Sequence, residues 1–294
     1  MDLSIVIVNY NSASYLRACL YSIFAAHTRH SCEVIVVDNA SRENLGPIVD
    51  EFGSRVRFLF NSTNIGFGRA VNQAVRASLS RFVLVLNPDT ELQVDTIERS
   101  IDSAEIRPEV GALGCRIVNP DGTLQLACRR AVPEPRDALF RFVGLSRLFP
   151  SSRRLARYNL TYLDDQVACE VEAISGSFML LRRVAIDQSG LFDESFFLFG
   201  EDLDLCLRIR RAGWKVFYDP SISILHHKGG SSSTRTFRTT VDFYHAMWIF
   251  YRKHYAGQNS VVTNALVWSG IWTLGGARIV ANWLTGQRRV GSNG

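Results

Sequence analysis

The chain of 294 residues is long enough for one large domain or one and a half, and its 47% hydrophobic and 21% charged residues exclude a disordered polypeptide. Its net charge of +5 is moderately basic, but no basic stripe interleaved with aromatic residues indicates a nucleic-acid partner. The six cysteines include no Cys-x-x-Cys pair, which predicts reduced thiols in a cytosolic protein. The amino terminus runs straight into an apolar strand, so we expect no signal peptide.

The first half of the chain alternates short apolar strands with amphipathic helices. Residues 3–8 form a continuous β-branched run, typical of a parallel strand covered on both faces, and a second strand at 34–37 repeats the plan. This alternation predicts an open α/β fold with a mostly parallel central sheet. Ligands bind at the carboxyl ends of such strands, so we expect Asn9, Asn11 and Asp38 at one crevice.

A third strand, at 56–60, leads into a Gly-x-Gly loop that contains Gly66 and Gly68. The two glycines permit close backbone approach, and the amino end of the following helix would attract an anion. The third glycine of the dinucleotide-binding fingerprint is missing. The alternative interpretation is a tight loop before an ordinary helix.

A buried strand at 82–86 ends in Asn87-Pro88-Asp89. Proline stops the strand and holds the next carboxylate at its tip. Asp89 suits two roles that the sequence does not separate. It is either the cap of the next helix or a ligand of a hard divalent cation, which proteins often hold through one or two carboxylates plus substrate phosphates.

The middle of the chain is less regular. A hairpin turn is predicted at 119–122, and the arginine-rich, proline-containing segment 129–157 is predicted to be a mobile excursion whose arginines form a solvated face rather than a binding site. A strand is expected from Val171 to Leu181, which either bends at Ser175-Gly176-Ser177 or lets a ligand approach closely there.

Three acids, Glu201, Asp202 and Asp204, follow an aromatic run and open a predicted helix. Acids in a first turn complement the helix dipole, but carboxylates in apolar surroundings also need a cationic partner or a chemical purpose. Arg208 is expected to be structural and to pair with Asp204 one turn back. Two further strand-like runs, 214–218 and 222–225, then lead to a pair of histidines.

The carboxyl-terminal part is predicted to be helical after a lid-like loop at 229–233. The run from Val261 to Leu284 contains one charge, Arg278, and three tryptophans. It is long enough to span a bilayer, but glycines and polar residues dilute it. We favour an amphipathic hairpin in the membrane interface over a span, and a dimer-forming or core-packing helix pair is the remaining alternative.

Six motifs in fixed order resemble glycosyltransferase family 2, and most closely its bacterial rhamnosyltransferases and galactofuranosyltransferase-like relatives. They are Ile-Val-Ile-Val-Asn-Tyr-Asn at 5–11, Val-Val-Asp-Asn-Ala-Ser at 36–41, Asn-x-Gly-Phe-Gly-x-Ala-x-Asn at 64–72, Leu-Asn-Pro-Asp-Thr at 86–90, Gly-Ser-Phe-Met-Leu-x-Arg at 176–182 and Phe-Gly-Glu-Asp-x-Asp-Leu-Cys-x-Arg at 199–208. The resemblance covers residues 3 to 230. It implies a GT-A fold for residues 1–230. The helical segment predicted from the residues of 231–294 is expected to associate with a membrane or with a second copy.

The resemblance also implies roles for individual residues. Asp38 would bind the pyrimidine base of a nucleotide-sugar, and Asp89 would hold Mg²⁺ or Mn²⁺ together with His226, for which His227 is the rival. Asn87 stands where the family carries the first acid of its Asp-x-Asp motif, which leaves one charged ligand there. The other positions implied to line the nucleotide-sugar pocket are Val8, Asn9, Tyr10, Asn64, Gly66, Arg69 and Asn87.

Inverting transfer needs a base for the acceptor hydroxyl, and Asp202 is the expected base, with Glu201 orienting or holding the acceptor. The resemblance implies transfer of L-rhamnose from dTDP-rhamnose to a saccharide or lipid-linked acceptor during cell-surface polysaccharide synthesis. A UDP-sugar donor is the alternative. We expect a cytoplasmic protein at the inner face of the cytoplasmic membrane, with a homodimer also possible. A sugar-nucleotide nucleotidyltransferase and a non-catalytic binding module are the competing interpretations.

Overall fold

The computed structural model describes residues 1–134, 136–137, 140, 144–227 and 237–290, with 284–290 as backbone only. The predicted loop at 229–233 lies outside the described residues. In chain order the elements are β1 (Leu3–Asn9), α1 (Ala13–Ala25), β2 (Cys32–Asp38), α2 (Gly46–Phe52), β3 (Val56–Phe60), α3 (Phe67–Arg76), β4 (Phe82–Leu86), β5 (Thr90–Leu92), α4 (Thr96–Glu105), β6 (Val110–Val118), η1 (Leu126–Cys128), β7 (Arg129–Arg130), α6 (Leu145–Leu148), η2 (Arg157–Asn159), β8 (Cys169–Val171), β9 (Ala173–Ile174), β10 (Phe178–Arg182), α7 (Arg183–Ser189), α8 (Glu201–Arg211), β11 (Lys215–His226), α9 (Phe237–His254), η3 (Ala256–Gln258) and α10 (Val261–Val290).

The core is one mixed sheet in the order β3-β2-β1-β4-β10-β6-β11-β5, with β8 added beside β11. Strands β3, β2, β1 and β4 are parallel, whereas β10 runs antiparallel between β4 and β6. The predicted α/β class with a mostly parallel sheet is confirmed. A separate small sheet pairs β7 with β9.

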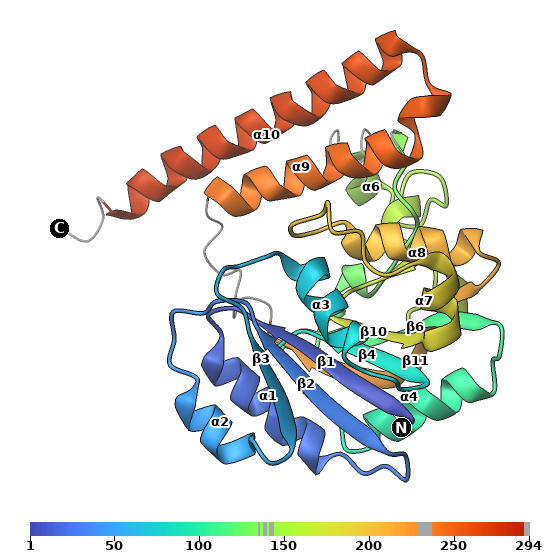
Figure 1. Cartoon of the computed structure of the whole chain (residues 1–294). Coiled ribbons are helices and arrows are strands. Elements are labelled where there is room, and N and C mark those ends of the chain that lie inside the picture. The colour runs from blue at the N-terminus through green and yellow to red at the C-terminus, as the bar shows by residue number, and fades with distance from the viewer. Residues whose placement is uncertain (135, 138–139, 141–143, 228–236, 291–294) are drawn as a thin grey trace.

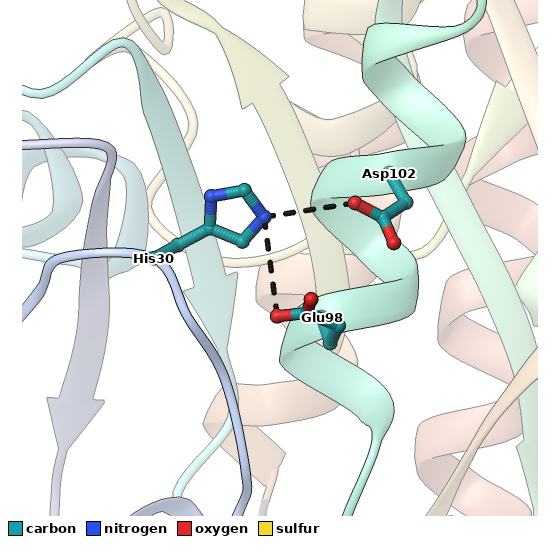
Figure 2. A group of neighbouring side chains, drawn as sticks. All are labelled: His30, Glu98 and Asp102. Carbon is teal, nitrogen blue, oxygen red and sulfur yellow. Dashed lines mark ion pairs between the residues drawn. The ribbon is translucent and has the colours of Figure 1, made fainter.

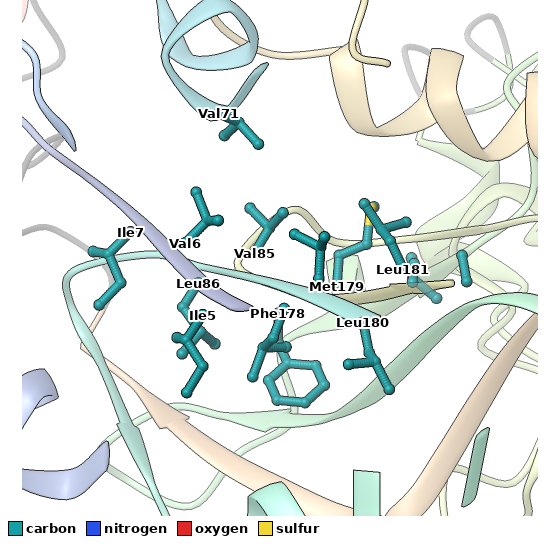
Figure 3. Close-up of a cluster of buried hydrophobic side chains, with 14 of the residues drawn as sticks. Ile5, Val6, Ile7, Val71, Val85, Leu86, Phe178, Met179, Leu180 and Leu181 are labelled. Atoms are coloured by element: carbon teal, nitrogen blue, oxygen red, sulfur yellow. The ribbon is translucent and has the colours of Figure 1, made fainter. Parts of the chain in front are cut away.

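The central strands are buried along their whole length, because helices cover both faces of the sheet. Figure 1 shows α3, α7 and α8 on one side and α1, α2 and α4 on the other. Figure 3 shows the apolar side chains of β1, β4 and β10 packed together, with Val71 of α3 above them. From β1 the chain adds β2 and β3 toward one edge of the sheet and then places β4 on the other side of β1. The strand order therefore switches between β1 and β4, and open α/β sheets bind ligands at such a switch point.

Two local predictions were wrong or incomplete, and a third is confirmed. The segment Val171 to Leu181 forms parts of three strands rather than one bent strand. The two runs at 214–218 and 222–225 form the single strand β11, which bulges between Asp219 and Ser223 because Pro220 has no N–H to donate to the ladder. The hairpin turn is confirmed, since the backbone N–H of Asn119 donates to Thr123 O at 2.8 Å.

The arginine-rich segment was predicted to be a solvated excursion, and its first two arginines contradict this. Arg129 and Arg130 are buried and form β7. The guanidinium of Arg129 donates to the backbone oxygens of Asp164 and Leu163, at 2.8 and 2.7 Å. Backbone oxygens therefore satisfy the buried guanidinium of Arg129, which the sequence pattern predicted to be solvent-exposed.

The carboxyl-terminal run is one continuous helix, α10, and not a hairpin in itself. The hairpin is formed by α9 and α10, which lie side by side at the edge of the molecule farthest from the sheet (Figure 1). Gly275 permits this packing, because a Cβ there would lie 3.1 Å from the ring of Tyr244 in α9. Among the helices of the described residues, none is long and apolar enough to cross a membrane.

Candidate active site

The first part of the site is a buried carboxylate at the ends of β1 and β2. These strands pair in parallel with Asn9 opposite Asp38. Asn9 Nδ2 donates to Asp38 Oδ1 at 2.9 Å, and Ser41 donates to Oδ1 through its hydroxyl at 2.6 Å and to Oδ2 through its N–H at 3.0 Å. Among the described residues Oδ2 thus has one donor and Oδ1 has two. Oδ2 is therefore the oxygen that can accept a ligand N–H, such as that of a pyrimidine base.

Asn64 and Gly66 shape the loop before α3. Asn64 Oδ1 accepts hydrogen bonds from Asn39 Nδ2 at 2.9 Å and from the N–H of Gly66 at 3.0 Å. Gly66 has φ +90°, and a Cβ there would lie 2.8 Å from the backbone oxygen of Phe197. The glycine therefore permits the close approach of the segment before α8.

The remaining residues expected at the nucleotide lie around this group. Val8 is buried in β1, while the side chain of Tyr10 is exposed directly after it. Arg69 is half-exposed and pairs with Glu194 at 3.0 Å, and Glu194 also binds Arg76 at 3.1 Å. Arg69 would have to leave Glu194 to bind a diphosphate.

The second part of the site joins Asp89 and His226. His226 ends β11, which pairs with β5 so that His226 lies opposite Thr90. This register places His226 Nε2 at 3.1 Å from Asp89 Oδ1, with both side chains buried. His227 turns elsewhere, since its Nε2 lies 2.6 Å from Glu91 Oε1. Of the two histidines, the structure brings His226 to Asp89.

Gln125 determines which nitrogen of His226 carries the proton. Its Nε2 donates to the backbone oxygen of His226 and to Asn119 Oδ1, both at 2.9 Å. Because only the nitrogen of an amide can donate, Gln125 Oε1 must accept, and it lies 2.8 Å from His226 Nδ1. The neutral ring therefore carries its proton on Nδ1 and presents a lone pair on Nε2.

This lone pair and a carboxylate oxygen lie 3.1 Å apart. Two such electron-rich atoms need either a shared proton or a cation between them. An imidazole whose second nitrogen is oriented by an outer partner is typical of metal sites. The donor set of Asp89 and His226 fits Mn²⁺ or Mg²⁺, with the other positions left for water and phosphate oxygens.

The third part of the site is the carboxylate pair at the start of α8. Asp202 Oδ2 lies 2.5 Å from Arg130 Nη2 and accepts the N–H of Gly176 at 3.2 Å. Glu201 is buried, and its Oε2 has no hydrogen-bond partner within the described chain. Burial raises the pKa of Glu201 to about 8, and the charge of Asp202 adds to this effect. The buried Glu201 carboxyl therefore keeps its proton at neutral pH.

The turn Ser175-Gly176-Ser177 connects the second and third parts of the site. Its Gly176 binds Asp202, as described above, and the Ser177 hydroxyl accepts from Asn87 Nδ2 at 3.2 Å. The same amide nitrogen of Asn87 lies 3.4 Å from His226 Nε2. The Asp202 carboxylate and the Asp89–His226 pair are thus linked through a single turn and one asparagine.

Asp204 belongs to a different, structural group. It is fully buried, with Lys253 Nζ and His254 Nε2 of α9 both at 2.7 Å from its Oδ1, and Arg208 Nε at 2.7 Å from its Oδ2. The predicted pairing of Arg208 with Asp204 is confirmed. This network ties α8 to the carboxyl-terminal hairpin.

Arg130, Gln125 and Gly176 are site residues whose roles were not predicted. Arg130 and Gln125 lie in an irregular segment without a motif, and their partners come from strands 44 to 101 residues away. Sequence periodicity carries no signal for such contacts. Gly176 did carry one, since a glycine inside a strand pattern indicates a bulge or a close approach.

A further cluster of ionisable residues lies at the opposite edge of the sheet. Figure 2 shows the ring of His30, which precedes β2, pointing toward Glu98 and Asp102 of α4. His30 Nε2 is 3.9 Å from Glu98 Oε2 and 3.6 Å from Asp102 Oδ1. Arg29 pairs with both carboxylates, at 2.5 Å from Asp102. The arginine already pairs with both carboxylates, so we interpret the cluster as a structural ion-pair group.

The sequence matches the family model described as "Glycosyl transferase family 2" over residues 4–190. The chain belongs to glycosyltransferase family 2. It is 32% identical, over 78% of its length and 77% of the relative, to an N-acetylglucosaminyl-diphospho-decaprenol L-rhamnosyltransferase of Mycobacterium tuberculosis. It is also 26% identical to the rhamnosyltransferase WbbL of Escherichia coli K12, over 80% of this chain and 88% of that one.

Solved structures of similar fold are GT-A glycosyltransferases. The chain aligns with residues 1–349 of TarS from S. aureus in complex with UDP-GlcNAc, with a TM-score of 0.61 and 17% identity over 92% of this chain and 72% of that one. It aligns with the mannosyltransferase PcManGT from Pyrobaculum calidifontis in complex with GDP-Man and Mn²⁺, with a TM-score of 0.58 and 16% identity over 97% and 79%. The chain has the GT-A fold of this family-2 enzyme class, with a helical carboxyl-terminal extension. Membership sets aside the nucleotidyltransferase interpretation.

Proposed function

We propose that the chain is an inverting rhamnosyltransferase that uses dTDP-rhamnose and a lipid-linked saccharide in polysaccharide synthesis. Its family carries out sugar transfer, and two of its relatives are named rhamnosyltransferases. The observation that supports the mechanism is the turn that links Asp202 to the Asp89–His226 pair, because it holds the proposed base and the proposed cation ligands near one another. The acceptor is inferred from the relative that acts on an N-acetylglucosaminyl-diphospho-decaprenol.

In this mechanism Asp38 accepts an N–H of the pyrimidine, which fixes the nucleotide at the ends of β1 and β2. Asp202 takes the proton of the acceptor hydroxyl while that oxygen forms a bond to the anomeric carbon. The bond from this carbon to the diphosphate oxygen breaks on the opposite face, and the nucleoside diphosphate leaves with the electron pair. Asp89 and His226 would hold a divalent cation, which would neutralise charge on the leaving diphosphate.

The first prediction concerns the metal and the donor. We expect the purified chain to bind dTDP-rhamnose more tightly than UDP-galactofuranose, UDP-glucose, UDP-N-acetylglucosamine or GDP-mannose, and only with Mn²⁺ or Mg²⁺ present. His226→Gln should abolish measurable Mn²⁺ binding in a titration, because it removes one of two protein ligands. The matched control is His227→Gln, which removes a neighbouring histidine that contacts Glu91 and should leave Mn²⁺ binding intact. Preference for a UDP-sugar would reject the rhamnosyl donor, and equal Mn²⁺ binding by both variants would reject the metal site.

The carboxyl-terminal hairpin supports a membrane-facing location for this reaction. Residues 243–294 contain five of the 33 basic residues and none of the 28 acidic ones, so the rest of the chain is balanced and the net charge of +5 belongs to this segment. On α10 the side chains of Val262, Leu266, Trp268 and Trp283 are exposed. A basic segment with exposed tryptophan and aliphatic side chains fits the interface of an anionic bilayer.

The second prediction tests this docking. We expect the full chain to float with vesicles that contain phosphatidylglycerol and not with vesicles of phosphatidylcholine alone, and the binding should weaken with salt. Replacing both Trp268 and Trp283 by Ser should reduce the bound fraction, whereas Leu79→Ser, a change of a 95% exposed side chain elsewhere, should not. The contrary result has two parts: the chain does not bind anionic vesicles, and it forms a dimer that dissociates in the double variant. That result would assign α10 to a homodimer interface.

A further inference from the structure

Arg130 is a buried cation in direct contact with the proposed base. It lies in β7, which pairs with β9 so that Arg130 is opposite Ala173. Its Nη2 donates to Asp202 Oδ2 at 2.5 Å and to the backbone oxygen of Ile174 at 3.0 Å. Side-chain exposure is 11% for Arg130 and 13% for Asp202. Water therefore screens this pair little, and its geometry is set by the backbone of two strands and a helix.

The donors around Asp202 occupy its two oxygens unequally. Oδ2 accepts two hydrogen bonds, from Arg130 Nη2 and from the N–H of Gly176. Oδ1 accepts the N–H of Leu203 at 2.8 Å. A carboxylate oxygen has two lone pairs, so within the described chain Oδ2 is saturated and Oδ1 keeps one acceptor position.

We propose that Arg130 is the positioning residue of the base: it fixes the Asp202 carboxylate through Oδ2 and so directs the acceptor hydroxyl to Oδ1. This inference rests on the proposed function and deepens it. A base that is itself oriented by a third group recurs in enzyme active sites. The proton of the acceptor then moves to Oδ1, while Arg130 and Gly176 keep the plane of the carboxylate in place.

The charge of Arg130 also separates the roles of the two neighbouring acids. Burial opposes the charge on Arg130, but the carboxylate of Asp202 outweighs burial and raises the pKa of the guanidinium. The positive charge thus stays beside Asp202, and Tyr158 also acts to raise this pKa. Glu201 is buried one residue away and holds its proton. Of the two acids, Asp202 is thus the one whose carboxylate is held in place by Arg130.

The test compares Arg130→Gln and Arg130→Lys with Arg129→Gln. Arg129 is an equally buried neighbour in β7 whose guanidinium binds the backbone oxygens of Asp164 and Leu163 and not Asp202. We expect Arg130→Gln to lower kcat about 100-fold, the cost of a misplaced catalytic group, with unchanged binding of the nucleotide-sugar. Arg130→Lys should restore part of the rate. Arg129→Gln should lower the melting temperature but keep kcat in the folded protein.

The second measurement is a double-mutant cycle with Asp202→Asn. If Arg130 acts through Asp202, Arg130→Gln should slow transfer in the wild-type background and cost nothing further in the Asp202→Asn background. A full additional loss in that background, or wild-type kcat in a folded Arg130→Gln variant, would overturn the inference. A variant that does not bind donor is replaced by Arg130→Lys in the same cycle. Absence of transfer by the wild-type chain, or no effect of Asp202→Asn, would instead overturn the proposed function.

Discussion

Asp202→Asn is expected to reduce sugar transfer by about 100- to 10,000-fold, the range that general base catalysis contributes. The substitution keeps the size of the side chain but removes the oxygen basicity that accepts the acceptor proton. The proposed nucleotide contact at Asp38 and the proposed cation site at Asp89 and His226 involve other side chains. We therefore expect the affinity for the nucleotide-sugar, measured by titration in the presence of Mn²⁺, to remain near that of the wild-type chain.

A non-catalytic binding module would respond differently to the same change. Its ligand affinity would be unaltered and no transfer would be seen in the wild-type chain either. Loss of donor binding in Asp202→Asn would also contradict the assignment, because it would make Asp202 a binding residue. Measuring kcat and donor affinity in the wild type and in Asp202→Asn thus distinguishes a catalytic base from a non-catalytic module and from a donor-binding residue.

Asp204→Asn is expected to destabilise the fold by about 3–5 kcal/mol without removing catalysis from the molecules that stay folded, because breaking a buried ion network leaves uncompensated charge. Asp204 is fully buried and contacts Arg208, Lys253 and His254 at 2.7 Å. The measurement is the free energy of unfolding by urea at pH 7. An unchanged value, or a folded variant without transfer, would contradict the structural role.

The pH dependence of this effect has a definite sign. Burial acts to raise the pKa of Asp204, but the hydrogen bond from His254 and the charge of Arg208 outweigh it and lower the pKa to about 2. In the unfolded chain the carboxyl has a pKa of about 3.9. The stabilisation is fully present above that value and is lost as the pH falls toward 2. The difference between the wild type and Asp204→Asn should therefore shrink between about pH 4 and pH 2.

The three acids at the start of α8 show what the sequence could and could not predict. Helical spacing places Asp204 one turn before Arg208, so their pairing was predictable. Asp202 and Asp204 differ by two positions and so point to different faces, one to Arg130 and one to α9. The partners on α9, Lys253 and His254, lie about 50 residues away, and no local pattern indicates that helix as the neighbour.

Strands β1, β2 and β4 were predictable because they are continuous apolar runs bounded by polar residues, and the same boundaries located Asn9, Asp38 and Asp89 at the carboxyl edge of the sheet. The central strand β6 was not predicted, since it lies mostly in the segment that was expected to be less regular. The orientation of side chains within the crevice was not. The choice between His226 and His227 depends on the register of β11 against β5. Register between distant strands follows from the packing of the whole fold.

Buried arginines mark the limit of reasoning from charge patterns. The sequence pattern predicts a solvent-exposed position for Arg130, because arginines are mostly exposed in proteins. In the fold it lies between a carboxylate and a backbone oxygen, and neither contact follows from residues near it in sequence. The role of such a residue can be identified only in the folded structure, where β7, β9 and α8 lie together.

The most direct test is a transfer assay with the purified chain, dTDP-rhamnose, Mn²⁺ and a polyprenyl-diphosphate-linked N-acetylglucosamine acceptor, with the product analysed by NMR. We predict a rhamnosylated lipid whose anomeric configuration is inverted relative to the donor, and little or no product with Asp202→Asn. Product of retained configuration, or undiminished transfer by Asp202→Asn, would contradict a single in-line displacement with Asp202 as its base.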